Sequence, residues 1–140
     1  MAKNDYKAYT LDVWYSEDGE NNYRIIKVSG EDTLDDLSEF ILDSFDFDHD
    51  HMYAFSTDGN IYGEESYHLN DPEHKSTKTQ IKKVLTKVDE RLIYLFDFGD
   101  EWVFAIDVKE IENIDKKIKP KLIESVGTLE QYPDFDEEDY

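Results

Sequence analysis

The stretch Tyr94–Trp102, YLFDFGDEW, places two carboxylates beside one glycine and contains the letters D-F-G. In a protein kinase the aspartate of this tripeptide binds Mg²⁺, so the first candidate chemistry is phosphoryl transfer. A kinase also needs a glycine-rich loop, a strand lysine and an H-R-D-type loop, in a chain about twice as long. None of these is present in the sequence, which therefore excludes a kinase.

The same stretch is also typical of a tight turn between two strands. Glycine adopts backbone conformations that are closed to residues with a side chain, so we expect Gly99 to make the bend. Aspartates in turns accept hydrogen bonds from nearby backbone amides, which is the role expected for Asp97 or Asp100. The sequence therefore predicts a structural turn of two to four residues that contains Gly99, with Trp102 mostly buried beside it.

A second candidate is a metal site in the segment FDFDHDHMY, where acidic residues and histidines alternate. Alternating aspartates open an EF-hand loop, but counted from Asp46 the sixth position is His51 instead of Gly and the twelfth is Thr57 instead of Glu. The EF-hand is therefore excluded. His49 and His51 would lie on one side of an extended strand and, with Asp50, could hold a divalent ion. The alternative is a polar loop whose second histidine begins a strand. This alternative is preferred, and no metal or cofactor is expected.

Covalent catalysis has little support in the sequence. The chain has no cysteine, and none of its serines lies in a G-x-S-x-G elbow. Its 35 acidic residues contain many carboxylate pairs by chance, so a pair suited to acid–base catalysis is not informative. No catalytic residue is predicted. The alternative is a metal-dependent enzyme that uses His49, His51 and nearby acids such as Asp50, Asp97 or Asp100.

Charge is the extreme property of the chain, because 35 acidic residues against 15 basic ones give a formal net charge of −20. No basic patch is visible that could bind a phosphate backbone, which argues against direct binding of nucleic acid or an anionic membrane. The acidity serves solubility, or it presents carboxylates to a basic protein partner. A third hypothesis is an acidic mimic of nucleic acid that inhibits an enzyme acting on DNA or RNA. The expected partner-binding residues are acids near the C-terminus: Asp134, Asp136, Glu137, Glu138 and Asp139.

A chain of 140 residues, 39% of them hydrophobic, is expected to form one domain with a hydrophobic core. We assign residues 1–133 to a single α+β domain and residues 134–140 to an acidic tail. The N-terminus lacks the apolar stretch of a signal peptide, and no run of eighteen apolar residues exists. A cytoplasmic protein is therefore expected.

The first half of the chain has regular apolar patterns. Alternating apolar and polar residues predict strands at 9–17 and 23–28, joined as a hairpin. Thr33 and Asp36 form a capping pair at the start of a helix. Apolar residues then recur every three or four positions as far as Phe45, which predicts an amphipathic helix facing a sheet.

In the second half, a shorter hairpin is expected at 51–63 and a surface loop at 64–78. A short helix is expected at 77–88, with Thr77 and Gln80 as its capping pair.

The strongest strand signal lies at 91–98 and 101–111, which predicts a long central hairpin. Residues 119–127 could add an edge segment. Together these elements predict an α+β fold with two layers: a mainly antiparallel sheet built from hairpins, with two helices on one face.

The order of these motifs resembles the plasmid pRi ORF-three-like family, whose members are often labelled as passenger proteins of insertion elements. That family typically has a H-L-Y-x-F strand and a Y-x-Y-D-F-G-D-x-W-x-H-x-I hairpin. The strand motif is matched by His51, Tyr53 and Phe55, and the hairpin motif by Tyr94, Asp97, Phe98, Gly99, Asp100, Trp102 and Ile106. The resemblance covers about residues 8–113. It implies an α+β domain of mobile-element and prokaryotic genomes, without an established biochemical activity.

The chain also departs from this family pattern. Phe104 stands where the family commonly has histidine, and the family's later cysteines and P-P-E-D-x-G-G segment are not recovered. If relatives build a His/Cys site there, this chain has lost most of its ligands, so the shared hairpin is interpreted as structural. We expect a non-enzymatic interaction module, associated with a mobile element or phage, whose acidic surface and tail engage a basic protein.

Overall fold

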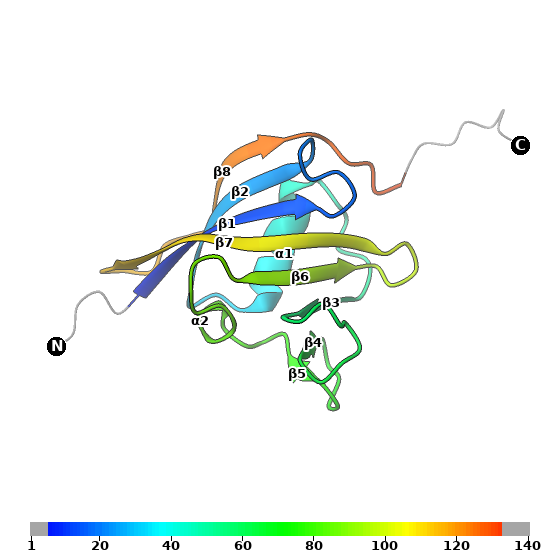
Figure 1. Cartoon of the computed structure of the whole chain (residues 1–140), viewed down its shortest axis with the longest axis horizontal. Helices are drawn as coiled ribbons and strands as arrows, with labels where there is room; N and C mark the ends of the chain where they lie inside the picture. Colours follow the sequence, from blue (N-terminus) through cyan, green and yellow to red (C-terminus); the bar gives the residue numbers. More distant parts are fainter. Residues whose placement is uncertain (1–5, 133–140) are drawn as a thin grey trace, which may run out of the picture.

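One sheet dominates the computed structural model, which describes residues 6–132 (Figure 1). Its elements are β1 (Tyr6–Tyr15), β2 (Tyr23–Ser29), α1 (Leu34–Ser44), β3 (Tyr53–Ser56), β4 (Ser66–His68), β5 (Lys75–Ser76), α2 (Ile81–Val84), β6 (Arg91–Phe96), β7 (Trp102–Ile114) and β8 (Lys121–Val126). The strands of the described residues lie in the order β5-β4-β3-β6-β7-β1-β2-β8. Neighbouring strands are antiparallel, except for β4 and β5, which are parallel. The predicted α+β fold with a mainly antiparallel sheet is confirmed.

The hydrophobic core lies between the sheet and α1, which Figure 1 shows behind the strands. The helix contributes Leu37 and Ile41 and β7 contributes Phe104, and all three side chains are buried. Burying an apolar side chain of this size stabilises a fold by about 1.5–3 kcal/mol. Ser38 of α1 and Tyr94 of β6 share a buried hydrogen bond of 2.6 Å between their hydroxyls, which fixes the helix on the sheet.

The start of α1 is the one predicted from the sequence. Asp36 N donates to Thr33 Oγ1 at 3.1 Å, and Thr33 N donates to Asp36 Oδ2 at 3.0 Å. This capping box satisfies two backbone amides that have no partner inside the helix. The helix ends at Ser44, one residue before Phe45, where the predicted apolar pattern stops.

The hairpin predicted at 51–63 is wrong in its second strand, because β3 pairs with β4. Asp58 Oδ1 accepts a hydrogen bond from Asn60 N at 2.9 Å, and Asn60 Oδ1 accepts one from Tyr62 N at 3.2 Å. These side chains satisfy the amides locally, so the segment forms turns instead of a strand. The surface loop predicted at 64–78 is also wrong in part, because it contains β4, whose three residues are all buried.

The second helix, α2, is shorter than predicted and has a different start. Its N-cap is Gln80, which makes no capping hydrogen bond through its side chain. The carbonyls of Thr77 and Thr79 accept hydrogen bonds from Asp35 N at 2.9 Å and Leu34 N at 3.0 Å, the first amides of α1. Two carbonyls of residues 77–79 therefore bind the N-terminal amides of α1, and these residues do not begin α2. The predicted capping pair of Thr77 and Gln80 is wrong.

The strands in the middle and at one edge of the sheet are those predicted from the sequence. β6 and β7 occupy central positions and pair antiparallel, and β8 adds an edge strand beside β2. Within residues 6–132, neither helix is long and apolar enough to cross a membrane.

Candidate functional site

A strongly acidic surface lies on α1 and the loop that follows it. Residues 31–50 contain nine acidic residues and no lysine or arginine. The apolar face of α1 packs on the sheet, so most of its acidic side chains face solvent. We define the acidic ridge as the exposed acids of this segment: Asp36, Glu39, Asp43, Asp46, Asp48 and Asp50.

Few cations neutralise this surface. Lys82 Nζ lies 2.6 Å from Glu31 Oε2, and Lys117 Nζ lies 3.5 Å from Asp32 Oδ1, both near the start of α1. Among residues 6–132, the six acids of the acidic ridge form no ion pair with lysine or arginine. The tail acids predicted to bind a partner lie outside the described residues: Asp134, Asp136, Glu137, Glu138 and Asp139.

The connection between β6 and β7 differs from the predicted glycine turn. Five residues connect the two strands, one more than the longest turn predicted, whereas Trp102 is mostly buried, as predicted. The left-handed positions are Asp97 (φ 66°) and Glu101 (φ 55°), not Gly99, so the conformation predicted for Gly99 is wrong. Asp97 Oδ1 accepts hydrogen bonds from Gly99 N at 3.0 Å and Asp100 N at 3.2 Å. Aspartate tolerates the left-handed conformation because its carboxylate bonds locally, which removes the need for glycine.

The two histidines predicted as alternative metal ligands have different partners. His49 Nε2 lies 2.9 Å from Asp43 Oδ1. His51 Nε2 lies 2.6 Å from Tyr132 OH and 3.4 Å from Asp97 Oδ2. Both histidines precede β3, so the strand geometry expected to place them on one side does not apply to them.

Two residues after β8 hold the loop that carries His51. Gln131 Oε1 accepts a hydrogen bond from Asp48 N at 2.6 Å, and Tyr132 OH donates to Asp50 Oδ2 at 2.8 Å. That hydrogen bond to the carboxylate is the main cause that raises the pKa of Tyr132 to about 12. Because the hydroxyl proton of Tyr132 goes to Asp50, His51 Nε2 donates its proton to the hydroxyl oxygen.

A second group of ligand-type side chains was not identified from the sequence. His68 ends β4, and Asp71 and His74 lie in the loop before β5; one ligand atom from each lies within 4.8 Å of the others. Among the residues that the structure describes, this is the only group of three such side chains that converges. The spacing H-x₂-D-x₂-H is visible in the sequence, but it lies in a segment predicted to be a surface loop.

Hydrogen bonds hold all three of these side chains. His74 Nδ1 lies 2.8 Å from Asp71 Oδ2, and this hydrogen bond is the main cause that raises the pKa of His74. The pKa of Asp71 is lowered, first by the amide of Glu73 and then by His74. His68 is buried, its Nε2 lies 2.7 Å from the carbonyl oxygen of Ile61, and its ring lies 4.1 Å from the ring of His74 between centroids.

Comparisons with known proteins support the fold and the family. No curated protein matches the chain. A solved structure, the protein of unknown function MM3350 from Methanosarcina mazei Go1, is similar with a TM-score of 0.73 and 21% sequence identity, over 86% of this chain and 69% of the other. At this identity the similarity shows the fold alone. The model of the plasmid pRiA4b ORF-3-like protein family matches residues 7–133, most of the chain. The chain therefore belongs to the plasmid pRiA4b ORF-3-like protein family.

Proposed function

We propose that this chain is a non-enzymatic interaction module that binds a basic protein partner through the acidic ridge. The observation that carries the proposal is the absence of lysine and arginine from residues 31–50, which hold nine acidic residues. A surface of one sign attracts a partner of the opposite sign and raises its association rate. The ridge supplies such a surface within the residues that the structure describes.

Solubility alone gives a weaker account of this arrangement. Asp36, Glu39 and Asp43 follow one another at steps of three and four along α1, where like charges destabilise a helix by a few tenths of a kcal/mol per pair. Solubility needs net charge but not its concentration on one helix. A cationic partner would relieve this repulsion, and the packing of α1 on the sheet already orders the backbone that carries the carboxylates.

The test removes charge from the ridge without removing the helix cap. The triple variant E39Q/D43N/D46N keeps Asp36, which caps α1. The immobilised chain is exposed to lysate at about 0.05 M and about 0.5 M salt, where the Debye length falls from roughly 14 Å to roughly 4 Å. We expect the unmodified chain to retain basic proteins at low salt and to release them at high salt, and the triple variant to retain few.

A matched control removes the same charge from other exposed positions. The variant E20Q/E64Q/E110Q alters two turns and β7 and leaves the acidic ridge intact. We expect it to capture the same basic proteins as the unmodified chain. Equal loss in both triple variants would mean that total charge, not the ridge, attracts the partner, and the proposal would then fail.

A short DNA duplex added to the captured complex distinguishes two kinds of basic partner. If the duplex displaces the partner, the ridge occupies a nucleic-acid-binding surface, which supports the mimic hypothesis. If the partner stays bound, an ordinary protein interface is supported.

A further inference from the structure

We propose that His68, Asp71 and His74 bind one divalent transition-metal ion of the zinc class. This goes beyond the proposed function, because the site lies on β4 and the loop after it, apart in sequence from the acidic ridge. Ligand atoms at about 2.0–2.2 Å from one tetrahedral ion lie roughly 3.3–3.6 Å apart. The three ligand atoms already lie within 4.8 Å of one another, so shifts of about 1 Å or less would bring them onto one ion.

The surroundings of His68 fit a metal-bound imidazole. The carbonyl oxygen of Ile61 can only accept a hydrogen bond, so His68 Nε2 carries the proton and Nδ1 keeps its lone pair. Metal-bound histidines almost always donate their other ring proton to a carbonyl or carboxylate, which fixes the ring. His68 is buried, so its ring is already held in place without an ion.

The loop after β4 positions the carboxylate. Asn70 takes a left-handed conformation (φ 56°), which turns the chain directly after the strand. Asp71 Oδ1 accepts a hydrogen bond from Glu73 N at 2.9 Å, and Asp71 Oδ2 faces His74 Nδ1 at 2.8 Å. A metal ion would replace the proton that these two groups share, because binding requires a carboxylate and a neutral imidazole.

The ligand set determines the class of ion. Two imidazoles and one carboxylate suit zinc and its neighbours in the first transition row, whereas Ca²⁺ and Mg²⁺ prefer oxygen ligands alone. The two neutral rings and one carboxylate would leave one positive charge on a divalent ion, which a chain of net charge −20 tolerates well.

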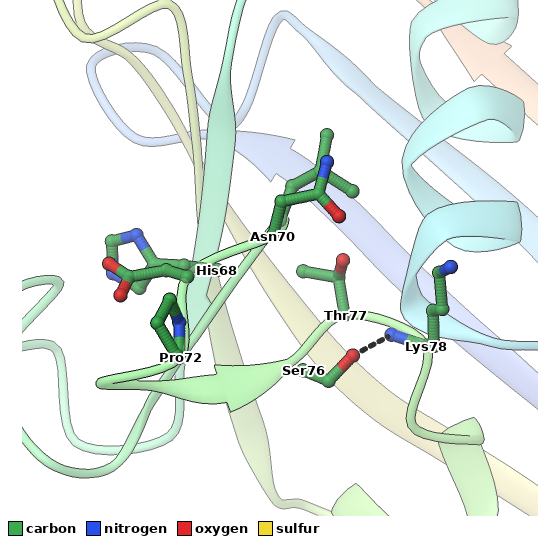
Figure 2. Close-up of a pocket in the computed structure, with 8 residues that line it drawn as sticks. His68, Asn70, Pro72, Ser76, Thr77 and Lys78 are labelled. Carbon is green, nitrogen blue, oxygen red and sulfur yellow. Dashed lines mark hydrogen bonds between the residues drawn. The ribbon is translucent and has the colours of Figure 1, made fainter.

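Three protein ligands leave a coordination position open, as in catalytic zinc sites. His68 and Asp71 also line an open hollow of about 380 Å³. Figure 2 shows His68 on one side of this hollow and Ser76 and Lys78 on the other.

The competing account is that Asp71 and His74 form only a hydrogen bond that stabilises the loop. To separate the two, the chain is produced without a histidine tag, stripped with a chelator, and titrated with Zn²⁺ against a chromophoric competitor. Metal content after dialysis gives the stoichiometry. We expect one zinc ion per unmodified chain, and visible absorption typical of four- or five-coordinate Co²⁺ when cobalt replaces zinc.

Two variants locate the ion. His74 is partly exposed, so His74→Ala should fold, which circular dichroism checks; we expect its zinc affinity to fall at least about 100-fold. The matched control His49→Ala/His51→Ala removes the other two histidines and should keep the affinity of the unmodified chain. The proposal is overturned if the unmodified chain binds no stoichiometric zinc, if His74→Ala binds it equally well, or if the control loses it.

Discussion

The four histidines of this chain form two pairs that differ in what the fold does with them. His49 and His51 are two residues apart, and the sequence suggests them as metal ligands only as the alternative to a polar loop. The structure gives them different partners, Asp43 for one and Tyr132 for the other. His68 and His74 are six residues apart, and the structure stacks their rings 4.1 Å apart. Spacing along the chain therefore predicts convergence only where the backbone conformation is also known.

The pairing of β4 and β5 explains the difference. In this parallel pair Tyr67 lies opposite Lys75 and His68 lies opposite Ser76, so the chain returns beside the strand that it has just left. This return brings His74 next to His68. Nothing comparable folds the chain back between His49 and His51.

The largest expected effect comes from removing the charge of the carboxylate beside each histidine pair. Asp71→Asn keeps the size of the side chain but removes its charge, and we expect zinc affinity to fall about 100-fold, or roughly 2.7 kcal/mol. Asp50→Asn is the matched change beside His51 and should leave the affinity unchanged. Both are measured by competition with a chromophoric chelator. If only Asp50→Asn lowered the zinc affinity, the ion would lie beside His51, and the site proposed at His68 and His74 would be wrong.

Each pair also lies near a residue in the left-handed conformation, Asp97 near His51 and Asn70 near His68. Asp97→Ala removes two hydrogen bonds from backbone amides, and alanine tolerates the left-handed conformation less well than aspartate. We therefore expect this variant to have a free energy of unfolding lower by about 2 kcal/mol. Asn70→Ala should cost about 1 kcal/mol, from the conformation alone. Urea denaturation measures both, and Asp97→Asn should recover most of the loss. Equal losses at the two positions would show that the amide hydrogen bonds of Asp97 contribute nothing.

The glycine of the same turn should be replaceable. Gly99 is not in the left-handed region, and an added Cβ would meet only Asp97 Oδ1, at 3.4 Å. We expect Gly99→Ala to change the free energy of unfolding by less than about 0.5 kcal/mol in the same urea experiment. A loss as large as that of Asp97→Ala would restore the role that the sequence predicts for this glycine.

The smallest effect concerns the hydroxyl of Tyr132, which forms hydrogen bonds with His51 and Asp50. The hydrogen bond to Asp50 raises the pKa of Tyr132 to about 12, above its ordinary value of about 10. A raised pKa means that the fold favours the protonated hydroxyl. Its contribution to stability is therefore complete below about pH 10 and is lost as the pH rises through about 12.

The absorbance of tyrosinate near 295 nm follows this titration. The difference between the unmodified chain and Tyr132→Phe isolates the titration of Tyr132. In the Asp50→Asn variant the same difference should move back toward pH 10. An unshifted titration in Asp50→Asn would show that Tyr132 is not bonded to this carboxylate.

The regular elements could be predicted from the sequence because apolar periodicity determines them. β1, β6 and β7 bury alternating or continuous apolar residues, and α1 combines a 3.6-residue apolar stripe with the cap formed by Thr33 and Asp36. The short elements could not be predicted in this way. β4 has three residues, too few for a period, and the start of α2 is set by the hydrogen bonds of Thr77 and Thr79 to another helix.

The two candidate sites also differ in how far the sequence predicts them. The acidity of the ridge was predictable from residue composition, whereas the tail acids predicted to bind a partner lie outside the described residues. The spacing of His68, Asp71 and His74 is visible in the printed sequence, but their convergence depends on the left-handed Asn70 and on the pairing of β4 with β5. Neither is encoded by a periodic pattern, so only the folded structure reveals the group.

The most direct test observes all four imidazoles at once. A long-range ¹H–¹⁵N spectrum of the chain labelled at histidine is recorded while Zn²⁺ is added to metal-free protein. We predict that the signals of His68 and His74 shift together and stop changing at one equivalent, while those of His49 and His51 stay in place. Shifts at His49 and His51 instead, or gradual shifts of all four signals without an end point, would contradict the account.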